Sequence, residues 1–557
     1  MTKIFLTGDL TFMGRSSVLL TRFFGPLLAC IGGIYATDLR PSRIRNVLLA
    51  GDSDLLQVYA MTDIANGPFL MHSNEYGYPD GTNFHLQYVE SDLVISILWA
   101  LRVIVRSPIF AVNLYIVLSF GLAYIAFYWM SKPIILSQLI RFTLSLSFAW
   151  LPATFIRLTY GHVFLSSTWM VALALGLLIR WSRDQPLTKL KRSVFYFGAI
   201  GIGLGTPYYA FFSACFCMLL IFLPPTGNTQ AHLFFRLKTL FLALLMVLPG
   251  LLKVAVTGFW IEERIVRTAQ SSLAYPGQLY TLLTPIGFPY LAPDVLVQPQ
   301  AEWVPSSLVM VLGLLLALRP VGTERHSDRF MRGGLLLGTM IFVSGGLGFI
   351  FASTVSPSLR VWVRIGPFIA ALSLVIFGYF LSESLFSKIH KRWHLLTHLL
   401  LLLIVFAQVF DGKQLTGGRF DEASANEFQE PYERSLASLE KVVGVGCPVL
   451  VLPIMQLPEG GSVGGVGNGD HLMPALLSSE FFWSYGGIKG TRFDDWITSA
   501  SQGDYEDLAA EARAVGMCAV WIDTRAETAG RYTDPGEWER LGVEYVGQFG
   551  PHVLLKF

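Results

Sequence analysis

A succession of long apolar runs limits what this chain can fold into more than any other feature. The runs lie near residues 18–36, 109–130, 134–155, 163–178, 194–223, 240–256, 307–318, 333–351, 365–381 and 395–409. A helix needs about 20 apolar residues to cross a bilayer, so the shorter runs need amphipathic flanks or a tilted position in a bundle. Of the 557 residues, 53% are hydrophobic and only 14% are charged, whereas soluble domains are about a quarter charged. We predict a mostly α-helical protein that crosses the membrane many times.

Basic residues between the runs predict the orientation, because lysine and arginine resist translocation. Four basic groups all lie on the cytoplasmic side if the run 194–223 crosses twice, with a turn at residues 205–207. Arg236 and Lys238 then lie inside as well. This arrangement predicts about eleven transmembrane helices, with the N-terminus in the cytoplasm and the C-terminus outside. The four groups are Lys3 and Arg15; Arg180, Arg183, Lys189, Lys191 and Arg192; Arg319, Arg325, Arg329 and Arg332; and Lys388, Lys391 and Arg392.

The overall charge and the cysteines argue against several other classes of protein. A net charge of +2 without a long basic stripe does not favour nucleic-acid binding. The five cysteines lack metal-ligand spacing, and Cys447 and Cys518 lie far apart in the polar tail, where they do not by themselves indicate a disulfide. No signal-peptide cleavage site follows the first apolar run, so we expect that run to remain as a membrane anchor.

The predicted orientation places three segments outside the cell membrane. Two are loops, residues 37–90 and 257–304, within a membrane domain that covers residues 1–410. The third is an extracytoplasmic domain over residues 411–557, whose alternating helices and strands predict a small α/β domain. Its Gly-rich segment 458–470 lacks the helix and lysine of a phosphate-binding loop, so we predict a surface loop there. The predicted helices cover residues 430–443, 505–514 and 536–541, with Asp504 as the N-cap of the second, and the strands cover residues 449–453, 518–522 and 553–557.

The motif GDSD at residues 51–54 places two carboxylates beside the bilayer, where an unpaired charge is costly. Asp54 and Gln57 match a capping box, so we expect a short helix over residues 55–65 on the outer membrane surface. Asp52 then stands free at the positive end of that helix, as a general base would. The pair Asp52 and Asp54 would also suit a divalent cation, which is the alternative interpretation.

Further polar residues of the outer segments are candidates for substrate binding. Residues 72–91 are rich in Tyr, Asn, Asp and His, which line many binding sites, although a solvated loop explains them equally well. His162 lies between two predicted helices with Arg157 and Tyr160, and would face the same outer cavity, although a short solvated turn explains these residues as well. The candidates in the first loop are Glu75, Tyr78, Asp80 and His85.

Two pairs of arginines lie at outer membrane ends, where their guanidinium groups would suit a lipid phosphate. Arg264 and Arg267 are three residues apart, and Arg360 and Arg364 are four apart, so each pair shares one helix face. The alternative for the first pair is an ion pair with a neighbouring glutamate. The second pair lies on the side where the positive-inside bias does not account for arginines.

This combination of a multi-pass bundle, an acidic motif after the first helix, arginines in later outer loops and an outer C-terminal domain resembles the type C (GT-C) glycosyltransferases. The most specific local match is GDSD, where these enzymes carry a catalytic aspartate, often followed by a second acid; here Ser53 separates the two. The resemblance implies that Asp52 is the base, with Asp54 as helper or cap, and that no cofactor or metal is required.

The resemblance also implies a function and a location. We expect an inverting glycosyltransferase of the bacterial inner membrane, which moves a hexose or pentose from a polyprenyl-phosphate donor to a cell-envelope glycan or glycolipid. The arginines would bind the donor phosphate. Three alternatives remain open at this point: a transporter or flippase of lipid-linked saccharides, which the broken run 194–223 would suit; a surface-polysaccharide polymerase or ligase centred on residues 257–304; and an assembly factor without chemistry.

Overall fold

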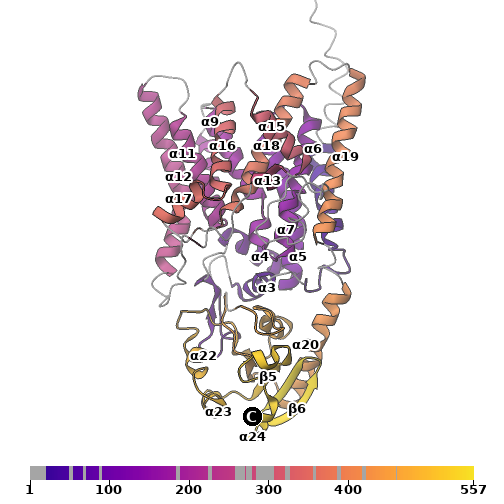
Figure 1. Ribbon diagram of the computed structural model, residues 1–557, viewed down its shortest axis with the longest axis vertical. Helices are drawn as coiled ribbons and strands as arrows, with labels where there is room; N and C mark the ends of the chain where they lie inside the picture. The colour runs from indigo at the N-terminus through magenta and orange to yellow at the C-terminus, as the bar shows by residue number, and fades with distance from the viewer. Residues whose placement is uncertain are drawn as a thin grey trace, which may run out of the picture.

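Two parts make up the molecule: a bundle of helices and, at one end of it, an α/β domain formed by the C-terminal quarter of the chain (Figure 1). The computed structural model describes residues 20–48, 54–66, 71–86, 91–183, 189–223, 229–257, 270, 279–283, 307–319, 326–355, 359, 361–385, 391–416, 422–458 and 461–557.

The bundle confirms a polytopic helical membrane domain. Five described segments are long and apolar enough to cross a membrane: Pro108–Ser131, Gln138–Thr159, His232–Lys253, Trp362–Glu383 and Leu396–Thr416. The number of eleven crossings remains a prediction. The helices are α2 (Gly25–Thr37), α5 (Pro108–Ser131), α6 (Gln138–Ala149), α7 (Pro152–Thr159), α8 (Val163–Ser166), α9 (Trp169–Ser182), α10 (Lys189–Gly203), α11 (Pro207–Phe222), α12 (Thr229–Thr257), α13 (Leu279–Leu283), α15 (Leu308–Ala317), α16 (His326–Phe342), α17 (Leu347–Thr354), α18 (Gly366–Phe380) and α19 (Lys391–Thr416), with short turns η1 (Leu20–Phe24), η5 (Trp362–Ile365) and η6 (Leu381–Leu385).

Several apolar runs are broken, and proline accounts for two of the breaks. The run 194–223 forms α10 and α11, with Pro207 at the first turn of α11, so the predicted break is confirmed. The run 134–155, which we expected to be one helix, is interrupted between α6 and α7 before Pro152. Proline lacks an N–H and restricts the residue before it, so a helix ends there and a new one begins.

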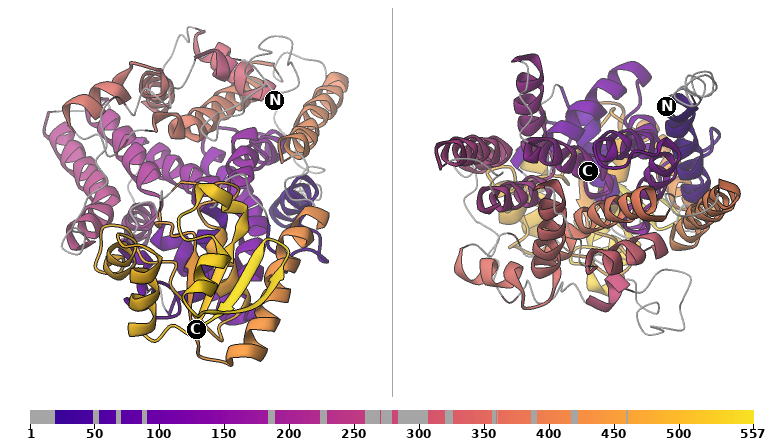
Figure 2. Two further views of the ribbon diagram at one scale, coloured as in Figure 1. Left: turned by 60° about the horizontal axis from the view of Figure 1, so that its bottom comes forward. Right: turned by 90° about the horizontal axis from the view of Figure 1, so that it is seen from above.

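Burial separates the inner helices from those that face lipid. In an 18-residue apolar window of Gln138–Thr159, 94% is buried inside the protein, whereas only 28% is buried in the windows of His232–Lys253 and Leu396–Thr416. Figure 2 (left) shows the corresponding helices, α12 and α19, at opposite sides of the bundle. The exposed faces of α12 and α19 are lined with leucine and phenylalanine, as expected for contact with lipid tails.

The described residues between α2 and α5 form more helices and strands than the sequence predicted. The predicted surface helix is confirmed as α3 (Asp54–Ile64). It does not lie on an open surface, because η7 (Asp470–Leu472) and α21 (Met473–Leu477) of the C-terminal domain pack on it. The sequence analysis did not identify the amphipathic helix α4 (Asp92–Val105). Between α3 and α4 lie β1 (His72–Ser73), β2 (Thr82–Asn83) and η2 (Phe84–Leu86).

The C-terminal domain is α/β, as predicted. Its five strands lie in the order β4-β3-β5-β7-β6; β3 is parallel to β4 and β5, and β7 is antiparallel to β5 and β6. Asp504 caps α23 in a capping box, which confirms that prediction. The elements are α20 (Glu422–Val443), β3 (Pro448–Leu452), η7 (Asp470–Leu472), α21 (Met473–Leu477), β4 (Phe482–Trp483), α22 (Asp495–Ala500), α23 (Tyr505–Ala514), β5 (Ala519–Asp523), η8 (Thr524–Ala529), α24 (Pro535–Arg540), β6 (Glu544–Phe549) and β7 (His552–Lys556).

A disulfide joins Cys447 and Cys518, just before β3 and β5. The sequence alone did not indicate this bond, because the two cysteines are 71 residues apart. The parallel pairing of β3 with β5 brings the starts of both strands together, with Val449 opposite Ala519. The bond therefore follows from the strand register rather than from the cysteine spacing.

Candidate functional site

A carboxylate–histidine pair lies where α3 meets the bundle. Asp54 is the first residue of α3, and its Oδ2 lies 3.2 Å from Nε2 of His162. The His162 side chain is only 8% exposed, whereas that of Asp54 is 45% exposed, so the carboxylate remains accessible. Two residues that the sequence analysis proposed separately, one as catalytic and one as substrate-binding, are thus in contact.

The backbone around His162 fixes its position. α7 ends at Thr159, and Gly161 follows with a φ of 78°, a conformation that glycine adopts without strain. The N–H of His162 then donates to the carbonyl of Arg157 at 2.8 Å, and α8 begins at the next residue. Among the described residues, Nδ1 of His162 has no hydrogen-bond partner. The imidazole is therefore held by its backbone, and its Nε2 edge faces Asp54.

A narrow cleft lies beside the turn that carries His162. About 250 Å³ between its atoms is unfilled, open solvent included, and none of this space is wide enough to take up a water molecule. The lining comes from α7, α8, the turn between α8 and α9, α11, η5 and the start of α18. The lining residues are Ala153, Arg157, Leu165, Thr168, Tyr209, Arg364 and Pro367.

Two guanidinium groups give the cleft a positive character. Arg157 is 5% exposed, and Arg364 stacks 4.4 Å from the ring centre of Tyr208. None of the described lining residues is acidic. Arginines in a partly dry, apolar cleft suit an anion with several oxygen acceptors, such as a phosphate.

Comparison with known proteins adds the fold family. No protein-family model and no curated protein matches the sequence. The arabinofuranosyltransferase AftD from Mycobacteria has a similar structure, with a TM-score of 0.54 and 14% identity over 96% of this chain. The oligosaccharyltransferase of Archaeoglobus fulgidus gives 0.51 and 12% over 91% of this chain. The chain has the GT-C fold. It spans 40% of the length of AftD and 70% of that of the oligosaccharyltransferase.

Within this GT-C fold, two of the predicted first-loop candidates are used in contacts with the C-terminal domain. The hydroxyl of Tyr78 donates to the carbonyl of Val515 at 2.7 Å. Asp80 Oδ2 accepts from the N–H of Trp496 at 2.9 Å, in the first turn of α22. Burial raises the pKa of the Asp80 carboxyl, and this hydrogen bond partly offsets that effect. Neither side chain lines the cleft.

The other two first-loop candidates lie near charged neighbours. Among the described residues, the partly exposed Glu75 carboxylate forms no hydrogen bond or ion pair; burial and the nearby Asp63 raise its pKa. His85 Nδ1 lies 3.8 Å from Asp92, which Lys253 of α12 contacts at 2.9 Å. Burial and Lys253 lower the pKa of His85. Both residues stay predictions for substrate binding.

The remaining predicted residues cannot be placed. Asp52, Arg264, Arg267 and Arg360 lie outside the described residues. Of the four predicted phosphate-binding arginines, only Arg364 is described, and it lines the cleft. In the described part of the chain, no group of three or more His, Cys, Asp or Glu side chains could hold a metal ion. The Asp52–Asp54 cation site is not tested by this, because Asp52 is outside that part.

Sequence reasoning did not assign roles to Thr168 and Tyr209, which line the cleft with the arginines. Tyr209 donates to the carbonyl of Leu165, which joins α11 to α8. Both residues lie in apolar runs, where a single hydroxyl side chain does not indicate a binding site. Only the folded arrangement brings them to one cleft.

Proposed function

We propose that this GT-C chain is a glycosyltransferase that moves a sugar from a polyprenyl-phosphate donor to a cell-envelope glycan or glycolipid. The observation that carries the proposal is the accessible Asp54 carboxylate, in contact with His162, together with a cleft next to the His162 turn whose described lining includes two arginines. A carboxylate next to a cationic cleft is what transfer of a sugar away from a phosphate needs. The bundle keeps the polyprenyl tail in lipid while the sugar reaches the outer end.

The reaction we propose is a single inverting displacement. The acid pair, with Asp52 as base and Asp54 as helper, takes the proton of an acceptor hydroxyl. The hydroxyl oxygen attacks the anomeric carbon from the face opposite the phosphate, and the bond from that carbon to the phosphate oxygen breaks. Arg157 and Arg364 stabilise the charge that grows on the departing phosphate. The outer arginines Arg264, Arg267 and Arg360 are proposed to assist.

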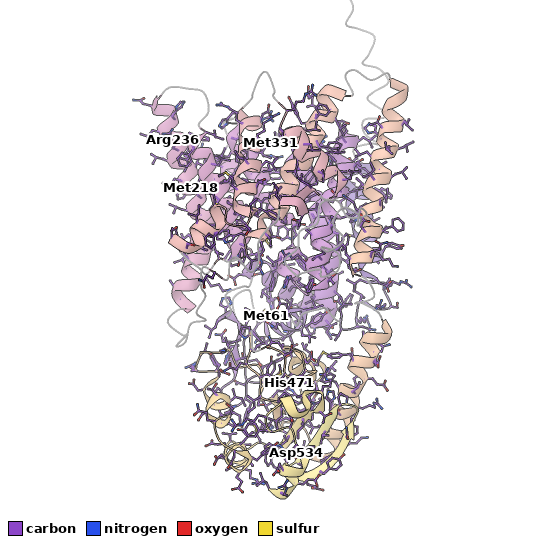
Figure 3. The ribbon with its side chains drawn as sticks, in the orientation of Figure 1. Met61, Met218, Arg236, Met331, His471 and Asp534 are labelled. Carbon is purple, nitrogen blue, oxygen red and sulfur yellow. A yellow bond between two sulfur atoms is a disulfide. The ribbon has the colours of Figure 1, made fainter. Side chains whose placement is uncertain are left out.

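The disulfide and the distribution of charge support an extracytoplasmic site. Disulfides persist in oxidising compartments, and the Cys447–Cys518 bond lies in the C-terminal domain that packs on α3. Figure 3 shows Arg236 at the opposite end of the bundle from His471 and Asp534, as the positive-inside rule requires if the C-terminal domain is outside. We propose that this membrane is the bacterial inner membrane.

The test is sugar transfer by the purified chain in lipid nanodiscs. Synthetic polyprenyl-phosphate hexoses and pentoses serve as donors, and an extract of envelope glycolipids serves as acceptor. We expect Asp52→Asn and Asp54→Asn each to lower the turnover number by about 100-fold or more, since a general base contributes 10²–10⁴-fold. Arg364→Ala should raise the donor KM. Transfer should continue in EDTA, because the proposed reaction uses no metal.

Asp38→Asn is the matched control, because Asp38 lies in the same outer segment but pairs with Arg40 at 2.8 Å and with Arg43. Its transfer rate should equal that of the wild type. If both acid variants transferred sugar at the wild-type rate, GDSD would serve only as a helix cap and the proposal would be rejected. Movement of lipid-linked saccharide across the bilayer without donor consumption would instead establish a transporter.

A further inference from the structure

The first outer segment is built into the sheet of the C-terminal domain. Residues 75–78 run alongside β4, the edge strand, and Tyr76 forms a parallel bridge with Trp483. The N–H of Trp483 donates to the carbonyl of Glu75 at 2.8 Å. The carbonyl of Trp483 accepts from the N–H of Tyr78, also at 2.8 Å. This is strand addition within one chain, between segments about four hundred residues apart in the sequence.

Two side chains that follow this added strand hold it in place as well. Thr82 is fully buried, and its Oγ1 donates to the carbonyl of Gly486 at 2.6 Å. Asp80 caps α22 through the N–H of Trp496. Gly77, with a φ of 72°, lies so close that a Cβ there would be 2.8 Å from the backbone nitrogen of Gly487. The contact therefore depends on backbone proximity as well as on side chains.

Tyr76 connects the added strand to α3. Its ring is fully buried, and its hydroxyl donates to Oδ2 of Asp63 at 3.2 Å, near the end of α3. Asp63 is also paired with Arg102 of α4 at 3.2 Å. The helix is thus held at its far end by Tyr76 and Asp63, and at its first residue by the contact between Asp54 and His162.

We propose that the C-terminal domain is a positioning element for the acid of the first outer loop, acting through Asp80 and Tyr76 on α3 and so on Asp54. The inference rests on the proposed function, because it assigns Asp54 a part in sugar transfer. α3 is a single helix of 11 residues, so a shift at its far end moves its first residue as well. Asp80, which the sequence offered as a substrate ligand, is a positioning residue in this scheme.

Asp80→Ala and Asp80→Asn test the proposal in the full chain in nanodiscs, because an asparagine carbonyl can still accept from Trp496. Asp534→Ala is the matched control: Asp534 caps α24 through Gly536 in the same way, at 2.9 Å, but lies at the far tip of the domain (Figure 3). We expect Asp80→Ala to lower kcat about tenfold, as a small misplacement of a reacting group does, with both KM values within about twofold of the wild type. Asp80→Asn should restore kcat, and Asp534→Ala should leave it unchanged.

Hydrogen exchange gives a readout that does not depend on activity. The amides of residues 75–83 and 54–64 should exchange faster in Asp80→Ala, and those of 54–64 faster in Tyr76→Phe, but not in Asp534→Ala. Unchanged exchange in both variants, or a raised acceptor KM with kcat unchanged, would overturn the proposal. If the wild type transfers no sugar while the exchange pattern appears, the proposed function fails and the docking of α3 stands.

Discussion

A single contact, Asp54 Oδ2 to His162 Nε2 at 3.2 Å, gives this molecule its most specific chemical feature. Both residues were visible as candidates in the sequence: Asp54 through GDSD, and His162 through its place in a short outer turn. Their contact was not visible, because it depends on how the fold brings the start of α3 to the turn between α7 and α8. A buried imidazole orients the carboxylate that it touches and limits its rotation, so the two side chains should act as a unit.

That unit can be tested by a double-mutant cycle on the turnover number. We expect His162→Ala to lower kcat by about tenfold or more, and the double variant with Asp54→Asn to be little worse than Asp54→Asn alone. The coupling energy of contacting residues is about 0.5–3 kcal/mol. Additive losses would show that His162 acts independently of Asp54. Correct folding of each variant is checked by its elution as a monodisperse species.

At the scale of elements, the sequence predicted what depends on local pattern and missed what depends on pairing. The run lengths predicted the helices, and Asp504 predicted the cap of α23. β4 has only two residues, and its strand conformation comes from its neighbours, β3 on one side and residues 75–78 on the other. No periodicity exists in two residues, so no sequence pattern could have indicated it.

The candidate site shows the same difference between what the local sequence predicts and what depends on the tertiary fold. Arg364 was proposed from its spacing and lies in the cleft, whereas Thr168 and Tyr209 required the packing of α9 and α11 to bring them there. The contact between Asp80 and Trp496 also required the tertiary fold. Spacing within one helix is readable from sequence, but distances between elements are not.

A charged cluster beneath α3 makes the C-terminal domain sensitive to acid. Asp523 at the end of β5 pairs with Arg525, which also contacts Asp470 at 3.0 Å. Beside this cluster lie two buried histidines, His471 and His552. Burial, and the positive charge of Arg525, lower the pKa of each to about 4, although Asp523 opposes the shift.

The sign of the effect follows from these values. Both histidines are neutral in the folded domain down to about pH 4, but titrate near 6.5 when unfolded. Stability from each neutral histidine is therefore complete above pH 6.5 and is lost as the pH falls towards 4, by up to about 3 kcal/mol. Asp494, whose pKa burial raises to about 6, titrates in this window with the opposite sign, so the wild type alone does not isolate the histidines.

We therefore expect the stability advantage of the wild type over His471→Gln to shrink between pH 6.5 and pH 4. The measurement is thermal unfolding of the full chain in nanodiscs at several pH values. Unfolding of the C-terminal domain is monitored by hydrogen exchange of the β3 and β5 amides. An advantage that stays constant across this range would mean that His471 is protonated in the fold, or that its burial costs nothing.

At the scale of the whole molecule, the fold brings the two parts of the candidate site together. The bundle supplies the cationic cleft, and the C-terminal domain packs on the loop that carries the acid. The opposite end carries Arg236 (Figure 3). This difference between the two ends of the molecule is the strongest constraint on the orientation of the chain in its membrane.

This orientation predicts how two engineered cysteines are labelled. Asp534→Cys should react with a membrane-impermeant maleimide in cells whose outer membrane has been permeabilised, and Arg236→Cys only in inverted membrane vesicles. Both positions are exposed at the protein surface, so neither is covered by other parts of the chain. Labelling of Arg236→Cys from outside would reverse the proposed orientation, and with it the compartment of the reaction.

The strand that residues 75–78 add to β4 has a consequence for solubility. An open sheet edge offers unpaired N–H and carbonyl groups, on which a second molecule can template a strand and begin aggregation. Here the protein's own loop occupies the backbone of Trp483. A variant that releases this loop would lose more than the placement of Asp54: it would expose an unpaired sheet edge, and neighbouring copies of the protein could pair with it.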